Sequence, residues 1–453
     1  MTSTTLASSF RDPSGFVFTE GDKLYRQVNF SYKDNYDMLM SSGLYNTLVK
    51  QNLLIPHEEA SIKNENAYKI IKPEIISFIS YPYEWCLSQL KDAALLTLKI
   101  QKIALTHEMS LKDASSYNVQ FKNSKPVFID TLSFEKYIEG KPWIAYKQFC
   151  QHFLGPLSLM SLKDIRLNQL LKTNIDGIPL DLVSSLLPFS TRLKPSLLLH
   201  LHLHAKSQKH YSNKTINKNN AFISKNSLLG LVDSLETTIN GLHWNPHGTV
   251  WADYYENTNY TSDSFKHKQE LVASFLDKNK TKSLLDLGAN EGVFSRLASD
   301  KNISTISCDM DPGSIEKSYL TSKKNNLNIL PLLLDLTNPS SDIGFNNEER
   351  SSIWKRISCD TVMALALIHH LAISNNLPLD TIAKFFSSIC KSLIIEFVPK
   401  NDSQVQKLLA NREDIFINYT QKDFEKTFNQ YFLIIDSAQI KESQRTLYNM
   451  QKK

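Results

Sequence analysis

The second half of the chain alternates short apolar runs with helical patterns, and this alternation constrains the fold more than any other feature. The seven runs cover residues 283–288, 304–309, 330–335, 361–367, 392–398, 432–436 and 445–449. Short apolar runs separated by helices are typical of strands in a mostly parallel sheet that is covered by helices. The sequence therefore predicts a doubly wound α/β domain in this half.

The composition indicates a globular protein without a strongly charged partner. The chain has 453 residues, a formal net charge of only +5 and 42% hydrophobic residues, and this length is enough for two or three domains. Neither a nucleic acid nor a membrane partner is indicated by so weak a charge, and no apolar run is long enough to span a bilayer. The five cysteines are widely spaced and form no C-x-x-C pair, which argues against a disulfide framework and a zinc site. We expect a cytoplasmic protein, whose oligomeric state the sequence does not fix.

A polar stretch divides the chain. Residues 205–226 are rich in Asn, Lys and Ser and lack apolar periodicity, which is typical of a linker or a long surface loop. The region before it mixes helical patterns with short strand-like runs. The sequence therefore predicts an α+β N-terminal domain at residues 1–204, a linker at 205–226 and the seven-stranded domain at 227–453.

The segment SLLDLGANEGVFS, residues 283–295, combines an apolar strand, a glycine turn and the start of a helix. Gly288 lets the backbone turn and approach a ligand closely, and the free N–H groups at the helix start attract a polar group. Asp286 lies near the carboxyl end of the strand, where such sheets bind ligands. A dinucleotide fingerprint requires a further glycine where Asn290 stands before Gly292, so the segment does not favour NAD.

This turn resembles the first motif of class I S-adenosylmethionine-dependent methyltransferases, in which a strand, an acid and two spaced glycines hold the methionine part of the cofactor. The resemblance covers roughly residues 250–453, and it implies a Rossmann-like seven-stranded fold with S-adenosylmethionine as cofactor. An acid at the end of the second strand can accept both ribose hydroxyl protons, and Asp309 is favoured over Asp311 for this role. The resemblance implies that Asp335, after the third strand, reaches the adenine amino group. The cofactor-binding residues expected are Asp286, Gly288, Asn290, Gly292, Asp309, Met310, Asp335 and Leu336.

The candidate catalytic residues follow the fourth and fifth runs. S-adenosylmethionine carries an electrophilic methyl group, so the protein must mainly align a nucleophile and remove a proton when the nucleophile is a hydroxyl. His369 and His370 follow the fourth run, and histidine ionises near neutral pH. Glu396, at the end of the fifth run, is the other candidate. Adjacent histidines point to different sides, so at most one would face the acceptor, and both could be structural. The acceptor stays unidentified, with a small molecule or a sugar hydroxyl favoured.

The segment before the first strand, residues 251–276, predicts a helix over the cofactor. Tyr254, Tyr255, Tyr260 and Lys266 are expected to line the pocket, because aromatic faces suit a sulfonium cation. An amphipathic helix packed on the sheet is the alternative for each of these residues.

The first half contains a loop that resembles the catalytic loop of protein and small-molecule kinases. A long helical pattern leads to Asp113, Asn118 follows five residues later, and a short strand ends in Asp130. Phosphoryl transfer needs a carboxylate near the acceptor hydroxyl and an Asn/Asp pair on Mg²⁺, and the resemblance places these roles on the three residues.

This segment also departs from the kinase pattern. Leu111 stands where a histidine is usual, Leu132 replaces a glycine, and no glycine-rich loop precedes. Arg26, in a hairpin predicted at residues 17–29, is a weak match to the strand lysine. The first half is therefore either kinase-like, active or degenerate, or an unrelated domain that selects the acceptor. For the whole chain, the alternatives to a methyltransferase are a kinase-like enzyme or pseudoenzyme with a nucleotide-binding second half, and a non-catalytic binding module.

The histidines His200, His202 and His204 are expected to be structural. No carboxylate lies at helical spacing between them, so the pattern does not match a metal-binding helix. The sequence predicts no metal site elsewhere.

Overall fold

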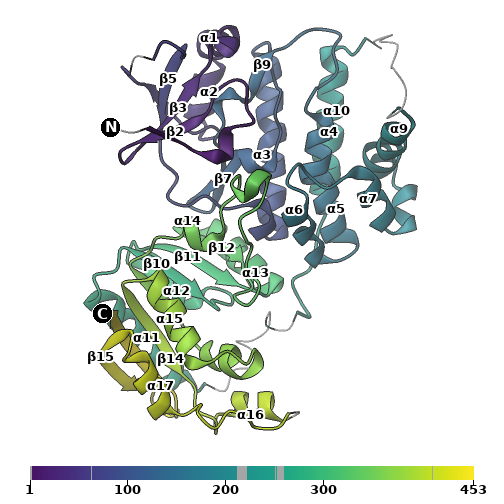
Figure 1. The fold of residues 1–453 in the computed structure, drawn as a ribbon. Coiled ribbons are helices and arrows are strands. Elements are labelled where there is room, and N and C mark those ends of the chain that lie inside the picture. The colour runs from purple at the N-terminus through teal and green to yellow at the C-terminus, as the bar shows by residue number, and fades with distance from the viewer. Residues whose placement is uncertain (1–2, 63, 212–221, 250, 252–259, 411) are drawn as a thin grey trace. The chain divides into compact units, whose positions relative to one another are not determined.

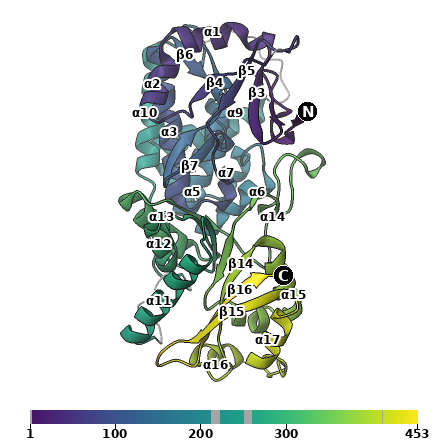
Figure 2. The same cartoon turned by 90° about the vertical axis from the view of Figure 1, so that its left-hand side faces the viewer.

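The computed structural model describes residues 3–62, 64–211, 222–249, 251, 260–410 and 412–453. The chain divides into two compact units, whose elements are labelled in Figures 1 and 2. Unit 1 comprises residues 1–244 and 340–352, and unit 2 comprises residues 245–339 and 353–453. Within the described ranges, no helix is long and apolar enough to cross a membrane. All five cysteines carry free thiols.

The boundary between the units differs from the predicted one. Helix α10 (Lys225–Asn240) was expected to open the second domain, but it packs against α3 (Leu87–Thr106) of unit 1. Its buried residues are spaced three or four apart and form one apolar stripe: Leu228, Val232, Leu235 and Ile239. The predicted linker is partly helical, because α9 spans His204–Tyr211, while residues 212–221 lie outside the described part of the chain.

Unit 1 begins with a five-stranded antiparallel sheet in the order β1-β2-β3-β5-β4. These strands are β1 (Ser3–Thr5), β2 (Val17–Glu20), β3 (Lys23–Val28), β5 (Lys69–Pro73) and β4 (His57–Glu59). The predicted hairpin is formed by β2 and β3, with Arg26 in β3. Helices α1 (Lys33–Ser41) and α2 (Leu44–Lys50) connect β3 to β4.

The rest of unit 1 is mainly helical and contains two small antiparallel sheets. Strand β6 (Met109–Leu111) pairs with β9 (Phe134–Lys136), and β7 (Val119–Lys122) pairs with β8 (Lys125–Phe128). Further helices are α4 (Tyr146–Phe149), α5 (Gly155–Leu162), α6 (Leu170–Thr173), α7 (Leu180–Leu186) and α8 (Pro195–Leu197). The α+β class predicted for this half is confirmed. The predicted long helix is α3, Asp113 and Asn118 lie in the region between α3 and β7, and the predicted short strand before Asp130 is β8.

A short segment from the middle of the unit 2 sequence belongs to unit 1. Within residues 340–352, Glu349 is 4% exposed and accepts hydrogen bonds at 2.9 and 2.6 Å from Nε and Nη2 of Arg11. The guanidinium carbon of Arg350 lies 4.3 Å from the ring centroid of Tyr117. The segment has no helical or strand periodicity, and no local pattern predicts that it joins the first core.

Unit 2 contains the predicted seven-stranded sheet, in the order β12-β11-β10-β13-β14-β16-β15. The strands are β10 (Ser283–Leu287), β11 (Ser304–Asp309), β12 (Ile329–Leu333), β13 (Thr361–Ala364), β14 (Ser392–Phe397), β15 (Phe432–Gln439) and β16 (Thr446–Lys452). β16 is antiparallel to both of its neighbours, and the other pairs are parallel. Numbered within the sheet, the order is 3-2-1-4-5-7-6.

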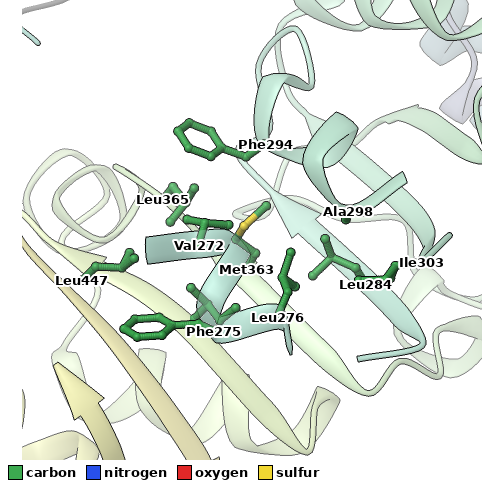
Figure 3. Close-up of a cluster of buried hydrophobic side chains, with 11 residues drawn as sticks. Val272, Phe275, Leu276, Leu284, Phe294, Ala298, Ile303, Met363, Leu365 and Leu447 are labelled. Carbon is green, nitrogen blue, oxygen red and sulfur yellow. The ribbon is translucent and has the colours of Figure 1, made fainter. Parts of the chain in front are cut away.

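Helices connect the strands of unit 2 and cover the sheet. They are α11 (Ser262–Lys278), α12 (Val293–Asp300), α13 (Pro312–Asn325), α14 (Ile353–Arg356), α15 (Leu379–Ile389), α16 (Ser403–Leu409) and α17 (Gln421–Phe428). Figure 3 shows a core cluster in which Val272, Phe275 and Leu276 of α11 pack with Leu284 of β10 and Met363 of β13. Because burial of apolar surface is the main stabilising term, this cluster fixes α11 on the sheet.

Candidate functional site

The carboxyl ends of β10, β11 and β12 lie at one edge of the sheet and carry the three predicted acids. Asp286 lies within β10, Asp309 is the last residue of β11, and Asp335 follows β12. The sheet reverses its order at β10, because β11 and β12 lie on one side of it while β13 and β14 lie on the other. Parallel α/β sheets bind their ligands at such a reversal.

The glycine turn after β10 requires glycine at both positions. Gly288 and Gly292 each have φ of 73°, a left-handed conformation that disfavours other residues. A Cβ atom on Gly288 would lie 3.2 Å from Cδ1 of Leu367, and one on Gly292 would lie 2.8 Å from Oγ of Ser318. Gly292 is the N-cap residue of α12, so the turn delivers the chain directly into that helix, as predicted.

Asp286 and Asp309 form a buried acidic pair beneath this turn. The backbone N–H groups of Asn290 and Asp311 donate to Asp309 at 2.8 and 2.9 Å, and Ser295 Oγ donates to Asp286 at 2.6 Å. Burial raises the pKa of Asp309 to about 6 and that of Asp286 to about 7, and the charge of Asp309 adds to the shift of Asp286. The pair therefore favours a ligand that brings positive charge or hydroxyl donors.

Asp311 is engaged by other groups. Its Oδ1 accepts the backbone N–H groups of Gly313 and Ser314 at the start of α13, and also the hydroxyl of Thr249 at 2.7 Å. The N–H of Trp251 donates to its Oδ2 at 2.9 Å. Asp311 therefore caps α13 and holds the segment around Trp251.

The remaining predicted cofactor residues lie at the rim of the same edge. Met310 is 63% exposed, so its apolar side chain offers a surface for a planar ring. Asp335 accepts hydrogen bonds from the backbone N–H and the hydroxyl of Thr337 at 2.8 and 2.7 Å, and Leu336 is half-buried.

The two candidate histidines start the π-helical turn after β13. His369 is 2% exposed, while the rings of His370 and Trp251 form a T-shaped contact with centroids 5.1 Å apart. Burial, together with the positive charge of Arg445, lowers the pKa of His370 to about 4, and burial lowers that of His369 well below its ordinary value. Both rings are neutral near pH 7. A base with so low a pKa is poorly matched to proton removal at neutral pH. Burial and low pKa therefore favour a packing or orienting role for both histidines.

Glu396, the third candidate, lies in a buried charge network that the sequence analysis missed. Lys268 Nζ donates to its Oε2 at 2.6 Å, the N–H of Ala366 donates to the same atom at 2.9 Å, and the hydroxyl of Tyr260 donates to its Oε1. Burial alone would raise the pKa of Glu396, but the charges of Lys268 and Arg445 outweigh burial and hold it below its ordinary value. Glu396 is therefore ionised and already saturated with donors, which fits an anchor better than a free base.

Arg445 extends this network to the loop before α16. Its Nε and Nη2 donate to the carboxylate of Asp402 at 2.7 and 3.0 Å, and its Nη1 donates to the hydroxyl of Tyr260 at 2.8 Å. Two cations thus face Tyr260, because Lys268 Nζ and Arg445 Cζ each lie 4.8 Å from its ring centroid. The network holds α11, β14 and the start of β16 together at the carboxyl edge.

The role of Lys266 in lining the pocket stays a prediction. Lys266 is exposed, and the buried lysine of α11 is Lys268, which lies on the face that also carries Val272. The sequence signal was a single lysine at helical spacing on an otherwise apolar face. Tyr254 and Tyr255 lie outside the described residues.

In unit 1 the structure brings the kinase-like residues together. Asp113 accepts hydrogen bonds from the N–H of Ser115 at 2.9 Å and Nε2 of Gln148 at 2.8 Å, and the Asn118 side chain also donates to it. Burial raises the pKa of Asp113, and the neighbouring charge of Asp130 adds to the shift. The three residues thus share one cluster.

Two of the three histidines before the polar stretch are buried and contact hydroxyl groups of unit 1. His200 is buried, with Nδ1 2.7 Å from the hydroxyl of Tyr146 and Nε2 2.9 Å from Oγ of Ser234. The two ring nitrogens of His202 likewise contact the hydroxyls of a serine and a threonine.

Unit 2 combines the strand order 3-2-1-4-5-7-6 and an antiparallel last strand with a glycine turn after the first strand and an acid at the end of the second. These features define the class I methyltransferase fold, and unit 2 has that fold. No family model matches the chain. Along its whole length, however, the chain is similar to the nodulation protein NoeA of Rhizobium meliloti (strain 1021), with 34% identity over 458 residues, covering 99% of this chain and 96% of NoeA. The chain belongs to the NoeA family.

Solved structures show weaker similarities. WbdD matches with 13% identity and a TM-score of 0.31, covering 42% of this chain and 40% of its own. The N-methyltransferase NodS from Bradyrhizobium japonicum WM9 matches with 9% identity and a TM-score of 0.32, covering 42% of this chain and 97% of its own. The magnesium protoporphyrin IX methyltransferase ChlM from Synechocystis PCC 6803, with bound S-adenosylmethionine, matches with 14% identity and a TM-score of 0.31, covering 44% and 89%. The fold of unit 2 follows from its strand order, independently of these matches.

Proposed function

We propose that unit 2 binds S-adenosylmethionine and transfers its methyl group to an acceptor molecule. The observation that carries the proposal is the placement of the Gly288 turn, Asp286 and Asp309 at the point where a class I methyltransferase sheet reverses its order. The family relationship to NoeA supports a conserved architecture over the whole chain, and the cofactor assignment rests on the residues of this edge.

The residues present fit the cofactor. Two carboxylates with raised pKa values lie under the turn, and a bound sulfonium ion would favour their ionised forms. Gly288 is left-handed and only partly buried, so no Cβ atom stands between its backbone and a ligand. Asp309 would accept hydrogen bonds from the ribose hydroxyls, Met310 would pack against the adenine, and Asp335 would face its amino group.

The bound cofactor would supply an electrophilic methyl group on sulfur: the acceptor oxygen or nitrogen would bond to the methyl carbon as the carbon–sulfur bond breaks, S-adenosylhomocysteine would leave, and the acceptor's proton would pass to solvent water. The chain's own task is to hold that nucleophile in line with the methyl carbon. On the acceptor side, Trp251 and the neutral ring of His370 offer an aromatic surface, while the charges of Lys268, Glu396 and Arg445 are paired with one another. This surface favours an uncharged polar acceptor, such as the hydroxyl of a small molecule or a sugar.

Titration calorimetry of the full chain tests the cofactor assignment. We expect S-adenosylmethionine and S-adenosylhomocysteine to bind at one site per chain. A chain that binds ATP but binds neither of these two ligands would contradict the proposal. Mass spectrometry of extracts incubated with the protein then tests transfer, through products heavier by one methyl group in place of one hydrogen. Cofactor binding without any methylated product would favour the non-catalytic binding module instead.

A further inference from the structure

The kinase-like cluster of unit 1, formed by Asp113, Asn118 and Asp130, plays no part in the proposed methyl transfer. Its contacts bear on whether it can bind a metal ion. The kinase-like fold implies a Mg²⁺-bound nucleotide on Asn118 and Asp130. Whether these residues fit such a group depends on what their polar atoms already contact. Asp130 and Asp113 have different hydrogen-bond and ion-pair partners.

The carboxylate of Asp130 is paired with the guanidinium of Arg26. Nη2 of Arg26 lies 3.0 Å from its Oδ1, the hydroxyl of Ser133 donates to its Oδ2 at 2.5 Å, and the N–H of Leu132 donates to Oδ1 at 3.2 Å. Arg26 and Asp130 are only 13% and 12% exposed at their side chains. The guanidinium therefore occupies the electrostatic position that a divalent cation would need, and a metal at Asp130 would face a fixed positive charge at close range.

The connection between β1 and β2 places a carboxylate where a phosphate-binding loop would be expected to offer backbone N–H groups. Asp12 in this connection accepts a hydrogen bond from Nη2 of Arg26 at 2.5 Å. Two residues later, Ser14 Oγ accepts a hydrogen bond from Nζ of Lys112 at 2.5 Å. Both cations near the cluster are thereby held by side chains of this connection, and a phosphate group brought to Arg26 would meet the negative charge of Asp12.

Asp113 is similarly committed. Its Oδ1 accepts two hydrogen bonds, from Ser115 and Gln148, and the amide of Asn118 donates to Asp113 and to Ser133 Oγ at 3.2 Å. The Asn118 amide thus acts as a donor between two neighbours.

We propose that unit 1 has replaced the metal-bound nucleotide of a kinase-like site with an internal ion cluster, in which Arg26 serves as the cation and Asp12 as the anion. Arg26 bridges Asp12 and Asp130, so the positive and negative positions of the site are both filled by the chain. Unit 1 consequently binds neither Mg²⁺ nor a metal–nucleotide complex. The ion cluster of Asp12, Arg26 and Asp130 instead links the β1–β2 connection to the segment after β8. This inference is independent of the methyl-transfer proposal.

The test uses the full wild-type chain with Mn²⁺ as a paramagnetic substitute for Mg²⁺, with and without ATP. We expect no saturable loss of the free Mn²⁺ signal in electron paramagnetic resonance at millimolar metal, and no shift of the unfolding temperature on addition of Mn²⁺ and ATP. Saturable binding of Mn²⁺–ATP by the wild-type chain, accompanied by a rise in unfolding temperature, would overturn the proposal. This arm does not depend on any variant.

A substitution tests the role assigned to Arg26. In Arg26→Met the side-chain stem is kept, but Asp12 and Asp130 lose their shared cation, so Mn²⁺ should now bind saturably and raise the unfolding temperature. The matched control is Arg166→Met, which removes an arginine from an exposed pair with Asp164 and should leave the protein indifferent to Mn²⁺. An Arg26→Met protein that folds, shown by an unchanged far-ultraviolet circular dichroism spectrum, and still ignores Mn²⁺ would show that Arg26 does not stand in for a metal. If the variant fails to fold, the wild-type measurement alone decides.

Discussion

The Nζ atom of Lys268 lies 2.6 Å from Oε2 of Glu396, and both side chains are almost completely buried at 3% and 0% exposure. This pair joins α11 to the carboxyl end of β14, and the charge of Asp286 in β10 also acts on Lys268. A buried charge is tolerated only when it is paired and hydrogen-bonded, and Glu396 has further donors in Ala366 and Tyr260. The pair therefore fixes the geometry of the edge where we place the cofactor and acceptor.

Removing the lysine should destabilise unit 2 strongly. Lys268→Met keeps most of the side-chain volume but leaves the Glu396 carboxylate without its nearest cation, and breaking a buried pair in this way costs about 3–5 kcal/mol. Urea unfolding measured by circular dichroism should show this loss in the free energy of unfolding. The control is Lys278→Met on the same helix, whose pair with Asp436 is exposed and should contribute less than about 1 kcal/mol. Equal effects of the two substitutions would contradict the anchor role.

Asp309→Ala should weaken binding of S-adenosylmethionine without unfolding the protein. Loss of hydrogen bonds to a charged group typically costs about 1.5–3 kcal/mol, which corresponds to roughly a 10- to 150-fold increase in the dissociation constant. Calorimetry measures this change directly. Asp300→Ala, at the exposed end of α12, serves as the control and should bind like the wild type. An unchanged dissociation constant in Asp309→Ala would remove Asp309 from the site.

The affinity for S-adenosylmethionine should rise as the pH increases from about 5 to 8. Burial raises the pKa of Asp309 to about 6 and that of Asp286 to about 7, so both carboxyls are protonated in much of the protein at pH 5. A cationic ligand favours their ionised forms, so binding strengthens as the pH passes these pKa values and levels off above them. Calorimetry across this range measures the effect.

Repeating the pH series with Asp286→Asn isolates the contribution of Asp286 to the rise in affinity. Ionisation of the cofactor itself is the same for both proteins and cancels. The variant should lose the part of the rise that lies around pH 7, and a parallel profile for both proteins would exclude Asp286 as its source.

Glu349→Ala should destabilise unit 1 although its sequence position lies among the strands of unit 2. The substitution removes two hydrogen bonds from Arg11 and one from the N–H of Phe345 at 2.7 Å, and we expect a loss of about 1–3 kcal/mol. Thermal unfolding of the full chain measures the loss. The neighbouring Glu348→Ala is exposed and should have almost no effect, so a similar shift for both would indicate that residues 340–352 are not anchored through Glu349.

Much of unit 2 could be predicted because its signals are local. Each apolar run encodes one strand, and the position of Asp309 at a strand end follows from the run in which it lies. The left-handed turn at Gly288 and Gly292 is a property of a few consecutive residues. The roles proposed for His369, His370 and Glu396 were less predictable, because a histidine or glutamate after a strand has the same sequence appearance whether it is free or saturated with partners.

Other features depend on contacts that no local pattern encodes. The apolar stripe of α10 was visible, but a stripe does not specify which core it joins, and the helix packs on α3 instead of opening the second domain. Lys266 and Lys268 differ by two positions, and only the rotation of α11 on the sheet decides that the second one is buried. In the first half, Asp113, Asn118 and Asp130 were predicted as a group, whereas the pairing of Arg26 with Asp12 and Asp130 was not.

The sequence by itself determined the strand and helix pattern of the second half, the glycine turn and the strand-end acids, because periodicity and turn chemistry act over a few neighbouring residues. Only the tertiary structure decided which charges meet: Lys268 with Glu396, Arg445 with Asp402, and Arg26 with Asp130. The reason is physical, since the strength of an ionic interaction depends on the distance between the charges and on their removal from water, and both are set when segments far apart in the chain pack together.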